Sequence, residues 1–454
     1  MLSFIALSVV LLAGNYLRMK MSLLRRLYLP SCVIAGLLGL MVVQIVHFAG
    51  GRIEAFASFD QALGQWIQPW SKLPGFLINI VFACLFLGVK IPGVKTLWNK
   101  SAPQLAYGQI VAWGQYFVAI GVWVVALKWL FPNLPNMFAA ILPVGFEGGH
   151  GTAAGMADTF AEFGWAAGKD YALTSATFGI LSAITVGMVL VNWAERKGYT
   201  SRKSGSDETE IIPVDQRPEA GKLTVNSDVI ETLSLHLAVI GVACLIGWLI
   251  DHGLSSIGQM TGNTQLERIF SAIPMFPLCM LGGLVVQLID NKFNKHHLID
   301  LGVVRRVQNC ALDFLVVAAI ATINLKVVAT GILPLVILVV VGLLWNIFCV
   351  MWLARRLLPD SWFERAIAEM GQSMGVTATG LLLLRVVDPE YETDAADAFA
   401  CKQLLHEPIM GGGVWTAMAV PLIATAGIGL PVVFGITSGA IVFWLIMAMV
   451  MKRK

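Results

Sequence analysis

Long apolar runs dominate the chain, and short polar segments separate them. A run of about 20 apolar residues is long enough to cross a bilayer as a helix. The pattern predicts ten spans, near 2–17, 30–48, 75–92, 105–130, 171–194, 229–250, 272–290, 311–329, 331–354 and 398–426, and an eleventh near 430–450. The chain is therefore predicted to be an all-α polytopic membrane protein.

A polar stretch from Glu195 to Asp228 separates five spans from the rest. Its composition cannot bury enough apolar surface to fold alone, so we expect a hydrophilic loop over 196–228. The predicted parts are an N-terminal repeat over 1–195, this loop, a C-terminal repeat over 229–428 and an extra helix over 429–454. Five spans before a cytoplasmic loop make the second half enter with the opposite orientation, which is the topology of an inverted repeat.

Weak internal similarity favours the same repeat. The pattern PxCxxxGL occurs at 30–37 and again at 277–284, at the start of the second span of each half. Chance similarity between apolar segments is the alternative.

Charge placement predicts the orientation. Charged residues make up only 13% of the chain and the net charge is +3, so the composition indicates no nucleic-acid partner. Basic clusters fall at 18–26, 90–100, 196–222, 292–306, 355–356 and the C-terminus. With an uncleaved first helix and the N-terminus outside, all of these clusters, the central loop and the C-terminus lie in the cytoplasm. The seven cysteines are interpreted as small apolar residues.

Two glycine-rich segments interrupt the apolar pattern, and we expect each to form a re-entrant hairpin. The first covers about 137–160 and contains EGGHGTAAG at 147–155, and the second covers about 362–388 and contains GQSMGVTATG at 371–380. Irregular backbone at membrane depth is tolerated only where it is buried in protein or lines a cavity. Entering from opposite faces, the two tips would meet near the midplane. The alternative to a re-entrant hairpin is that the glycines allow two helices to pack closely, or that the segment is an ordinary loop.

Backbone groups at such tips can bind a carboxylate and a cation without a charged side chain. Glycine lets a ligand approach the backbone closely. The hydroxyls of Thr152, Thr377 and Thr379 could coordinate sodium or substrate. His150 could bind a carboxylate, relay a proton or cap a turn, because imidazole titrates near neutral pH.

Four charged residues near these segments are further candidates. Glu147 and Asp158 flank the first turn, and intramembrane carboxylates are costly enough to indicate function, although either could lie at an aqueous mouth. Arg385 could pair with a substrate carboxylate, reach the interface or pair with Asp388. Glu407 follows His406 in a tenth span that GGG at 411–413 would kink, and a structural pairing of these side chains is equally compatible with the sequence.

GGHGT at 148–152 and ATFG at 176–179, together with the order of spans, resemble the bacterial sodium/glutamate symporters. The resemblance implies a homodimer in the bacterial cytoplasmic (inner) membrane that takes up L-glutamate with sodium by an elevator-like, alternating-access movement. It also implies which residues line the substrate and ion site: Gly148, Gly149, His150, Gly151 and Thr152, together with Gly375, Thr377 and Thr379. Sodium, expected as the coupling ion, would lie near both tips, and no cofactor is expected.

Three departures from that family pattern concern the substrate. The second hairpin is less rich in glycine, the tenth span carries HEP and GGG, and an eleventh span is appended. Aspartate, a hydroxy acid or another organic carboxylate could therefore occupy the site. A proton-coupled exchanger using His150, Glu147 and Glu407 is an alternative. A membrane enzyme or sensor is disfavoured, because the sequence has neither HExxH nor a P-loop motif.

Overall fold

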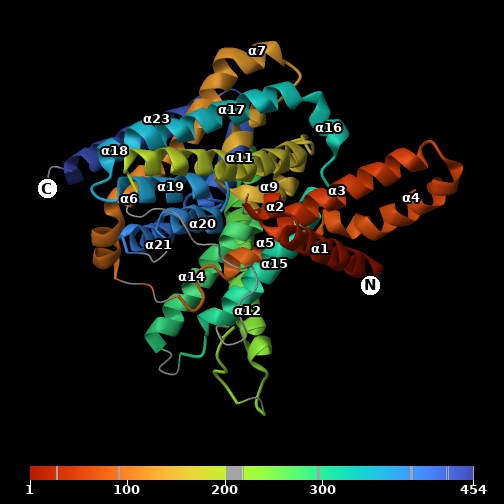
Figure 1. The fold of residues 1–454 in the computed structure, drawn as a ribbon, viewed down its shortest axis with the longest axis horizontal. Helices are drawn as coiled ribbons and strands as arrows, with labels where there is room; N and C mark the ends of the chain where they lie inside the picture. The colour runs from red at the N-terminus through yellow and green to blue at the C-terminus, as the bar shows by residue number, and fades with distance from the viewer. Residues whose placement is uncertain are drawn as a thin grey trace. The chain divides into compact units, whose positions relative to one another are not determined.

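The computed structural model describes residues 1–26, 29–89, 91, 93–200, 217, 219–226, 228–293, 297–388, 392–425, 427 and 429–452. Within these ranges the regular structure is helical and contains no strand (Figure 1). Arg453 and Lys454 of the predicted basic C-terminus, and 201–216 of the predicted loop, lie outside the described residues.

The chain forms two compact units, Met1–Lys90 with Asp207–Asn324 (unit 1) and Ile91–Ser206 with Leu325–Lys454 (unit 2). Each unit combines segments from both halves of the sequence. This is compatible with two repeats that each contribute helices to both units, but the repeat boundaries stay a prediction.

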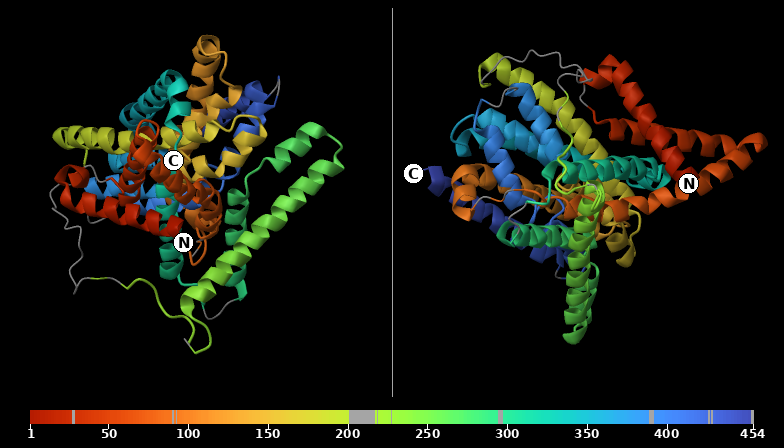
Figure 2. Two further views of the ribbon diagram at one scale, coloured as in Figure 1. Left: turned by 90° about the vertical axis from the view of Figure 1, so that its right-hand side faces the viewer. Right: turned by 90° about the horizontal axis from the view of Figure 1, so that it is seen from below.

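Unit 1 is a set of closely packed helices. They are α1 (Leu2–Lys20), α2 (Ser22–Arg26), α3 (Ser31–Gly50), α4 (Glu54–Ile67), η1 (Gln68–Ser71), α5 (Leu73–Ala83), α12 (Thr232–Met260), α13 (Thr264–Ser271), α14 (Met275–Phe293) and α15 (Leu301–Ala321). In Figure 2 the long α12, drawn in green, runs beside α14. Small residues allow this approach, since a Cβ added to Gly247 of α12 would lie 2.6 Å from the backbone nitrogen of Cys279.

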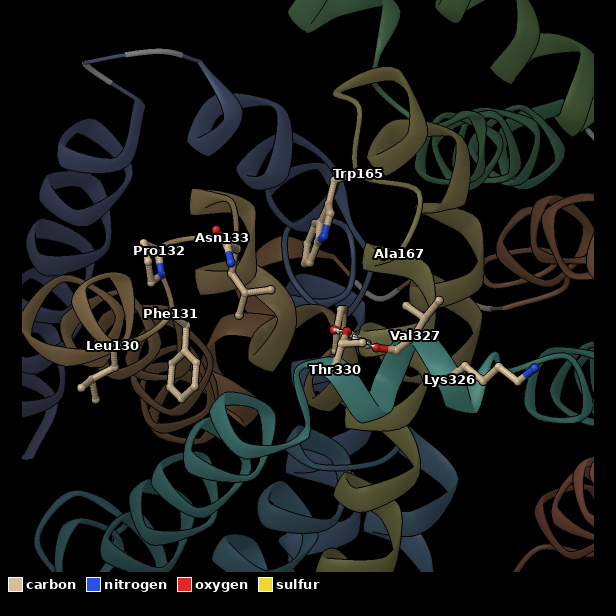
Figure 3. Close-up of a pocket in the computed structure, with 11 residues that line it drawn as sticks. Leu130, Phe131, Pro132, Asn133, Trp165, Ala167, Lys326, Val327 and Thr330 are labelled. Carbon is tan, nitrogen blue, oxygen red and sulfur yellow. Dashed lines mark hydrogen bonds between the residues drawn. The ribbon is translucent and has the colours of Figure 1, made fainter.

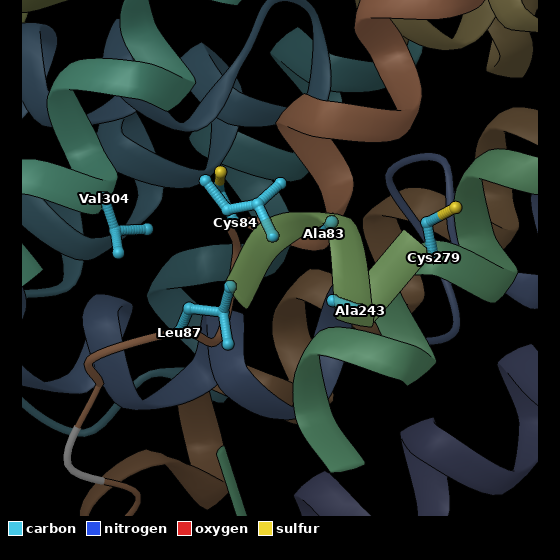
Figure 4. Close-up of a cluster of buried hydrophobic side chains, with 7 residues drawn as sticks. Ala83, Cys84, Leu87, Ala243, Cys279 and Val304 are labelled. Atoms are coloured by element: carbon cyan, nitrogen blue, oxygen red, sulfur yellow. The ribbon is translucent and has the colours of Figure 1, made fainter. Parts of the chain in front are cut away.

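The core of unit 1 contains small apolar side chains from four helices and from the turn after α5. Figure 4 shows this cluster, which includes Ala83, Cys84, Leu87, Ala243, Cys279 and Val304. The two labelled cysteines pack here as buried free thiols, in agreement with their interpretation as apolar residues.

Unit 2 combines long helices with short, interrupted ones. In chain order they are α6 (Val94–Val122), the π-helix η2 (Trp123–Leu127), α7 (Lys128–Leu130), η3 (Asn136–Ala140), α8 (Ile141–Phe146), α9 (Gly149–Gly155), α10 (Ala157–Glu162), α11 (Gly168–Lys197), α16 (Leu325–Thr330), α17 (Ile332–Phe348), the π-helix η5 (Cys349–Leu353), α18 (Ala354–Leu357), α19 (Trp362–Ser373), α20 (Thr377–Val387), α21 (Ala395–His406), α22 (Val414–Ala424) and α23 (Gly429–Lys452). Figure 1 shows α19, α20 and α21 packed together, with α11 alongside.

Among the described residues, seven helices are long and apolar enough to cross a membrane: Leu2–Lys20, Ser31–Gly50, Lys95–Leu130, Gly168–Lys197, Thr232–Met260, Ile332–Leu357 and Gly429–Met451. The pattern predicted eleven. Helices also occupy the other four predicted positions, but α5 has only 11 residues, α14 and α15 carry charged residues, and the tenth is divided into α21 and α22. The structure thus supports an integral membrane protein with about seven such helices.

The first glycine-rich segment is more regular than expected. Most of EGGHGTAAG is helical, because Gly149–Gly155 forms α9, and the irregular backbone is confined to the joint between α8 and α9. There Gly149 adopts a positive φ of 67°, which favours glycine. Helix α9 packs against α11, and such tertiary packing can outweigh the low helix propensity of glycine.

The second glycine-rich segment is a pair of helices joined at Met374–Val376. Helix α20 folds back on α19, so that a Cβ added to Gly371 would lie 2.7 Å from the Cα of Gly380. Both glycines are therefore required for close packing. The pairing agrees with the predicted hairpin, while its entry into the membrane from one face stays a prediction.

Candidate functional site: a buried polar cluster where three helix breaks meet

Three interruptions of helices come together inside unit 2. A Cβ added to Gly149, at the α8–α9 joint, would lie 3.1 Å from the carbonyl oxygen of Gly375, at the α19–α20 joint. A Cβ added to Gly411, in the segment between α21 and α22, would lie 3.7 Å from the carbonyl oxygen of Glu147. The joints of the two glycine-rich segments therefore lie against each other, and the break in the tenth span lies beside them. That these joints are the tips of two re-entrant hairpins at the membrane midplane stays a prediction.

Glu147 lies at the α8–α9 joint and is 3% exposed. Its Oε1 accepts hydrogen bonds from His406 Nε2 at 2.7 Å and from Gln372 Nε2 at 2.9 Å. Its Oε2 is buried and has no hydrogen-bond partner among the described residues. One carboxylate thus connects all three breaks and keeps an oxygen available for a ligand.

The tautomer of His406 follows from its neighbours. Trp113 Nε1 donates to Gln109 Oε1 at 2.8 Å, which leaves the amide nitrogen of Gln109 to donate to His406 Nδ1 at 3.1 Å. Since Nδ1 accepts, a neutral imidazole carries its proton on Nε2 and donates it to Glu147. The contact needs no charge on His406.

Lys402 of α21 lies at the centre of the cluster, with no exposed surface. Its Nζ donates to Glu369 Oε1 at 2.6 Å, Gln403 Oε1 at 2.8 Å and Gln372 Oε1 at 3.1 Å. Gln104 of α6 donates to the other oxygen of Glu369 at 2.9 Å. The ammonium therefore joins α19 and α21 through three side-chain oxygens.

A second set of bonds joins the start of α20 to the end of α21. Thr377 donates its hydroxyl to Glu407 Oε1 at 2.7 Å. Gln403 Nε2 donates to the hydroxyl oxygen of Thr377 at 2.6 Å and to Glu407 Oε1 at 2.9 Å. Glu407 is only partly buried, so this part of the cluster is the more accessible one.

The candidates of the first tip are placed around the joint. His150 is buried on α9, and its Nε2 lies 3.0 Å from the hydroxyl of Thr177 on α11. That hydroxyl donates to the carbonyl oxygen of Leu173, so it accepts from His150. Thr152 is fully buried, and its hydroxyl has no partner among the described residues. His150 thus ties α9 to α11 and does not cap the turn, whereas Thr152 has an unused oxygen.

The remaining candidates divide into two groups. Gly148 and Gly151 flank Gly149 and His150, and Thr379 packs against Gly375, so these four lie at the tips. Asp158 on α10 and Arg385 on α20 are exposed, and neither takes part in the bonds of the cluster described above. The carboxylate of Asp388 accepts hydrogen bonds from the backbone N–H groups of Glu392 and Thr393 and from the hydroxyl of Thr393.

Sequence reasoning missed Gln109, Glu369, Gln372, Lys402 and Gln403. The available signal was helical spacing, because Glu369 and Gln372 are three residues apart and Lys402 and His406 are four apart. Residues at such spacings share one face of a helix. Polar residues on one face of a membrane-embedded helix indicate a functional interior.

A separate cavity of about 590 Å³ lies elsewhere in unit 2. It is lined by residues from the end of α7 and the segment after it, from the loop before α11, from α11 itself and from α16 (Figure 3). Tyr171 donates to the carbonyl oxygen of Val327 at its wall. None of the candidate residues lines this cavity, so it is distinct from the cluster.

Comparison with known proteins points to one family. The family model described as sodium/glutamate symporter matches residues 1–392. The sodium/glutamate symporter of Escherichia coli is 20% identical over 392 residues, which cover 86% of this chain and 89% of that protein. The sodium/glutamate symporter of Haemophilus influenzae is 26% identical over 282 residues, which cover 62% and 61% of the two chains. No solved structure matches the chain.

Proposed function

The chain belongs to the sodium/glutamate symporter family, and we propose that it couples the entry of sodium to the uptake of L-glutamate or a closely related anionic amino acid. It is a transporter and not an enzyme. Sodium and the substrate are both cargo, and they bind together at the three helix breaks of unit 2.

The charge balance of the cluster is the observation that carries the proposal. The cluster contains three carboxylates, of Glu147, Glu369 and Glu407, and one ammonium, of Lys402, which contacts Glu369. With His406 neutral and all carboxylates ionised, the formal charge is −3 + 1 = −2. An anionic substrate would add to this negative charge, so binding of cations together with the substrate favours its entry. Oxygen ligands suit a hard cation, and the unpaired Oε2 of Glu147 is one of them.

The substrate carboxylates would bind at a different position from the cations. Helix α20 begins at the second tip, and the first N–H groups of a helix have no intrahelical partners. Together with the helix dipole, these groups bind anions. Thr377 lies at this N-terminus beside the partly buried Glu407, whose carboxylate would hold the substrate ammonium. Gly148 to Thr152 and Gly375 to Thr379 would form the walls.

The proposed movement is an elevator-like displacement of unit 2 against a scaffold formed by unit 1. It is supported by the position of the whole cluster inside one unit. The proposed inverted repeat, with two re-entrant hairpins, is supported by a shared irregularity: α6 and α17, the fourth span of each half, are both followed by a π-helix. We further propose a homodimer in the bacterial inner membrane, with the N-terminus outside.

Uptake into proteoliposomes tests the function. We expect an inward sodium gradient, with equal pH on both sides, to drive accumulation of labelled L-glutamate. Unlabelled aspartate, hydroxy acids and other carboxylates, added as competitors, identify the substrate. A pH gradient that drives uptake without sodium would instead support a proton-coupled exchanger, which the buried hydrogen bond between His406 and Glu147 makes the second candidate.

A further inference from the structure

The surroundings of Lys402 resemble those of a bound cation. All three protons of its ammonium are directed to side-chain oxygens, one from a carboxylate and two from amides, at 2.6 to 3.1 Å. The centroid of the Phe399 ring lies 5.8 Å from Nζ of Lys402, which is within the range of a cation–π contact. Gly108 of α6 makes room for the pair, since a Cβ there would lie 2.6 Å from Cε of Lys402.

A buried ion pair is a weak source of stability. Burying two charges costs solvation energy that their attraction often fails to recover, so apolar replacements of a buried pair are often neutral or stabilising. Lys402 and Glu369 are both fully buried. A buried pair in the interior of a membrane protein therefore points to a function.

The ammonium orients two amides toward the proposed binding site. Because Lys402 attracts the carbonyl oxygens of Gln372 and Gln403, their nitrogens point away from it. The nitrogen of Gln372 then donates to Glu147, and that of Gln403 donates to Thr377 and Glu407. A metal cation in the same place would attract the same oxygens and orient the amides in the same way.

We propose that Lys402 is a resident cation in a position that would otherwise bind a coupling sodium ion. The oxygens of Glu369, Gln372 and Gln403 are hard ligands of the kind that such an ion requires. The transporter consequently carries one sodium fewer per glutamate than the cluster could hold. This inference rests on the proposed sodium-coupled function.

The test removes the resident cation with Lys402→Ala. The vacated oxygens should then bind sodium, so the reversal potential of glutamate flux in proteoliposomes should shift to that of one additional sodium per glutamate. Equilibrium binding of labelled sodium should likewise rise by one ion per protomer. Lys100→Ala is the matched control, because Lys100 belongs to the same unit but forms an exposed pair with Asp397.

A second variant separates this role from a structural one. In the double variant Lys402→Met with Glu369→Gln, the site loses both charges, so no cation should replace the ammonium, and this variant should lack the additional sodium ion that Lys402→Ala binds. An unchanged sodium count in Lys402→Ala would overturn the inference. So would failure of that variant to fold at any sodium concentration when the double variant folds. Sodium-independent glutamate transport by the wild type would instead contradict the proposed function itself.

Discussion

The meeting of the two glycine-rich tips predicts a specific effect of Gly149→Ala. Gly149 has a φ of 67°, and left-handed backbone costs a residue with a Cβ about 1–2 kcal/mol. The new Cβ would also lie 3.1 Å from the carbonyl oxygen of Gly375 and 3.2 Å from Cγ1 of Val376. Favourable contacts between carbon atoms are about 3.5–4.0 Å, so the two tips must separate by a few tenths of an ångström.

Gly164→Ala provides the matched control. Gly164 has a φ of 77° in the same unit, but nothing lies within 4 Å of its added Cβ. Both variants should therefore lose about 1–2 kcal/mol of stability from backbone strain. Only Gly149→Ala should also displace the second tip.

The assay is sodium-dependent binding of L-glutamate to purified protein, with thermal unfolding measured in parallel. We expect Gly149→Ala to weaken binding by more than about tenfold, which corresponds to about 1.4 kcal/mol. Gly164→Ala should bind as the wild type does. Equal affinities in the two variants would refute the claim that contact between the tips forms the site.

Three further substitutions test individual contacts by the same binding assay. Glu147→Gln removes a buried negative charge and should weaken sodium-dependent binding by at least about tenfold, because a hydrogen bond to a charged group contributes more than one between neutral groups. An unaltered sodium dependence would exclude Glu147 as a ligand. His150→Ala breaks the bond between α9 and Thr177 and should abolish binding while the protein stays folded, whereas wild-type affinity would argue against a role of this tip. Arg385→Ala changes an exposed residue and should alter affinity by no more than about twofold, and a larger loss would restore Arg385 as a substrate contact.

The sequence pattern predicted the helical class and some of the places where helices break. Glycine and proline act through local backbone geometry, so the joints at Gly149 and after Met374 could be located from composition alone. The end of α5 at Ala83 could not, because 75–92 is apolar beyond the point where the helix stops. Hydropathy measures burial, and turns in a buried segment are as apolar as helices.

The cluster itself was only partly predictable. Glu147, His150 and Glu407 were candidates because charged or titratable side chains are rare in apolar runs. Their partners could not be assigned from the sequence. Glu147, for example, forms a hydrogen bond with His406, and the two residues are separated by 259 positions in the chain. Such pairs form only when the helices pack. The pair between Lys402 and Glu369 is likewise visible only in the folded unit.

Simultaneous uptake of labelled sodium and labelled L-glutamate into the same proteoliposomes tests the central claim most directly. We predict that the two enter together in a fixed ratio, and that glutamate uptake ceases when choline replaces sodium. Glutamate uptake that continues at the same rate in choline would contradict the account.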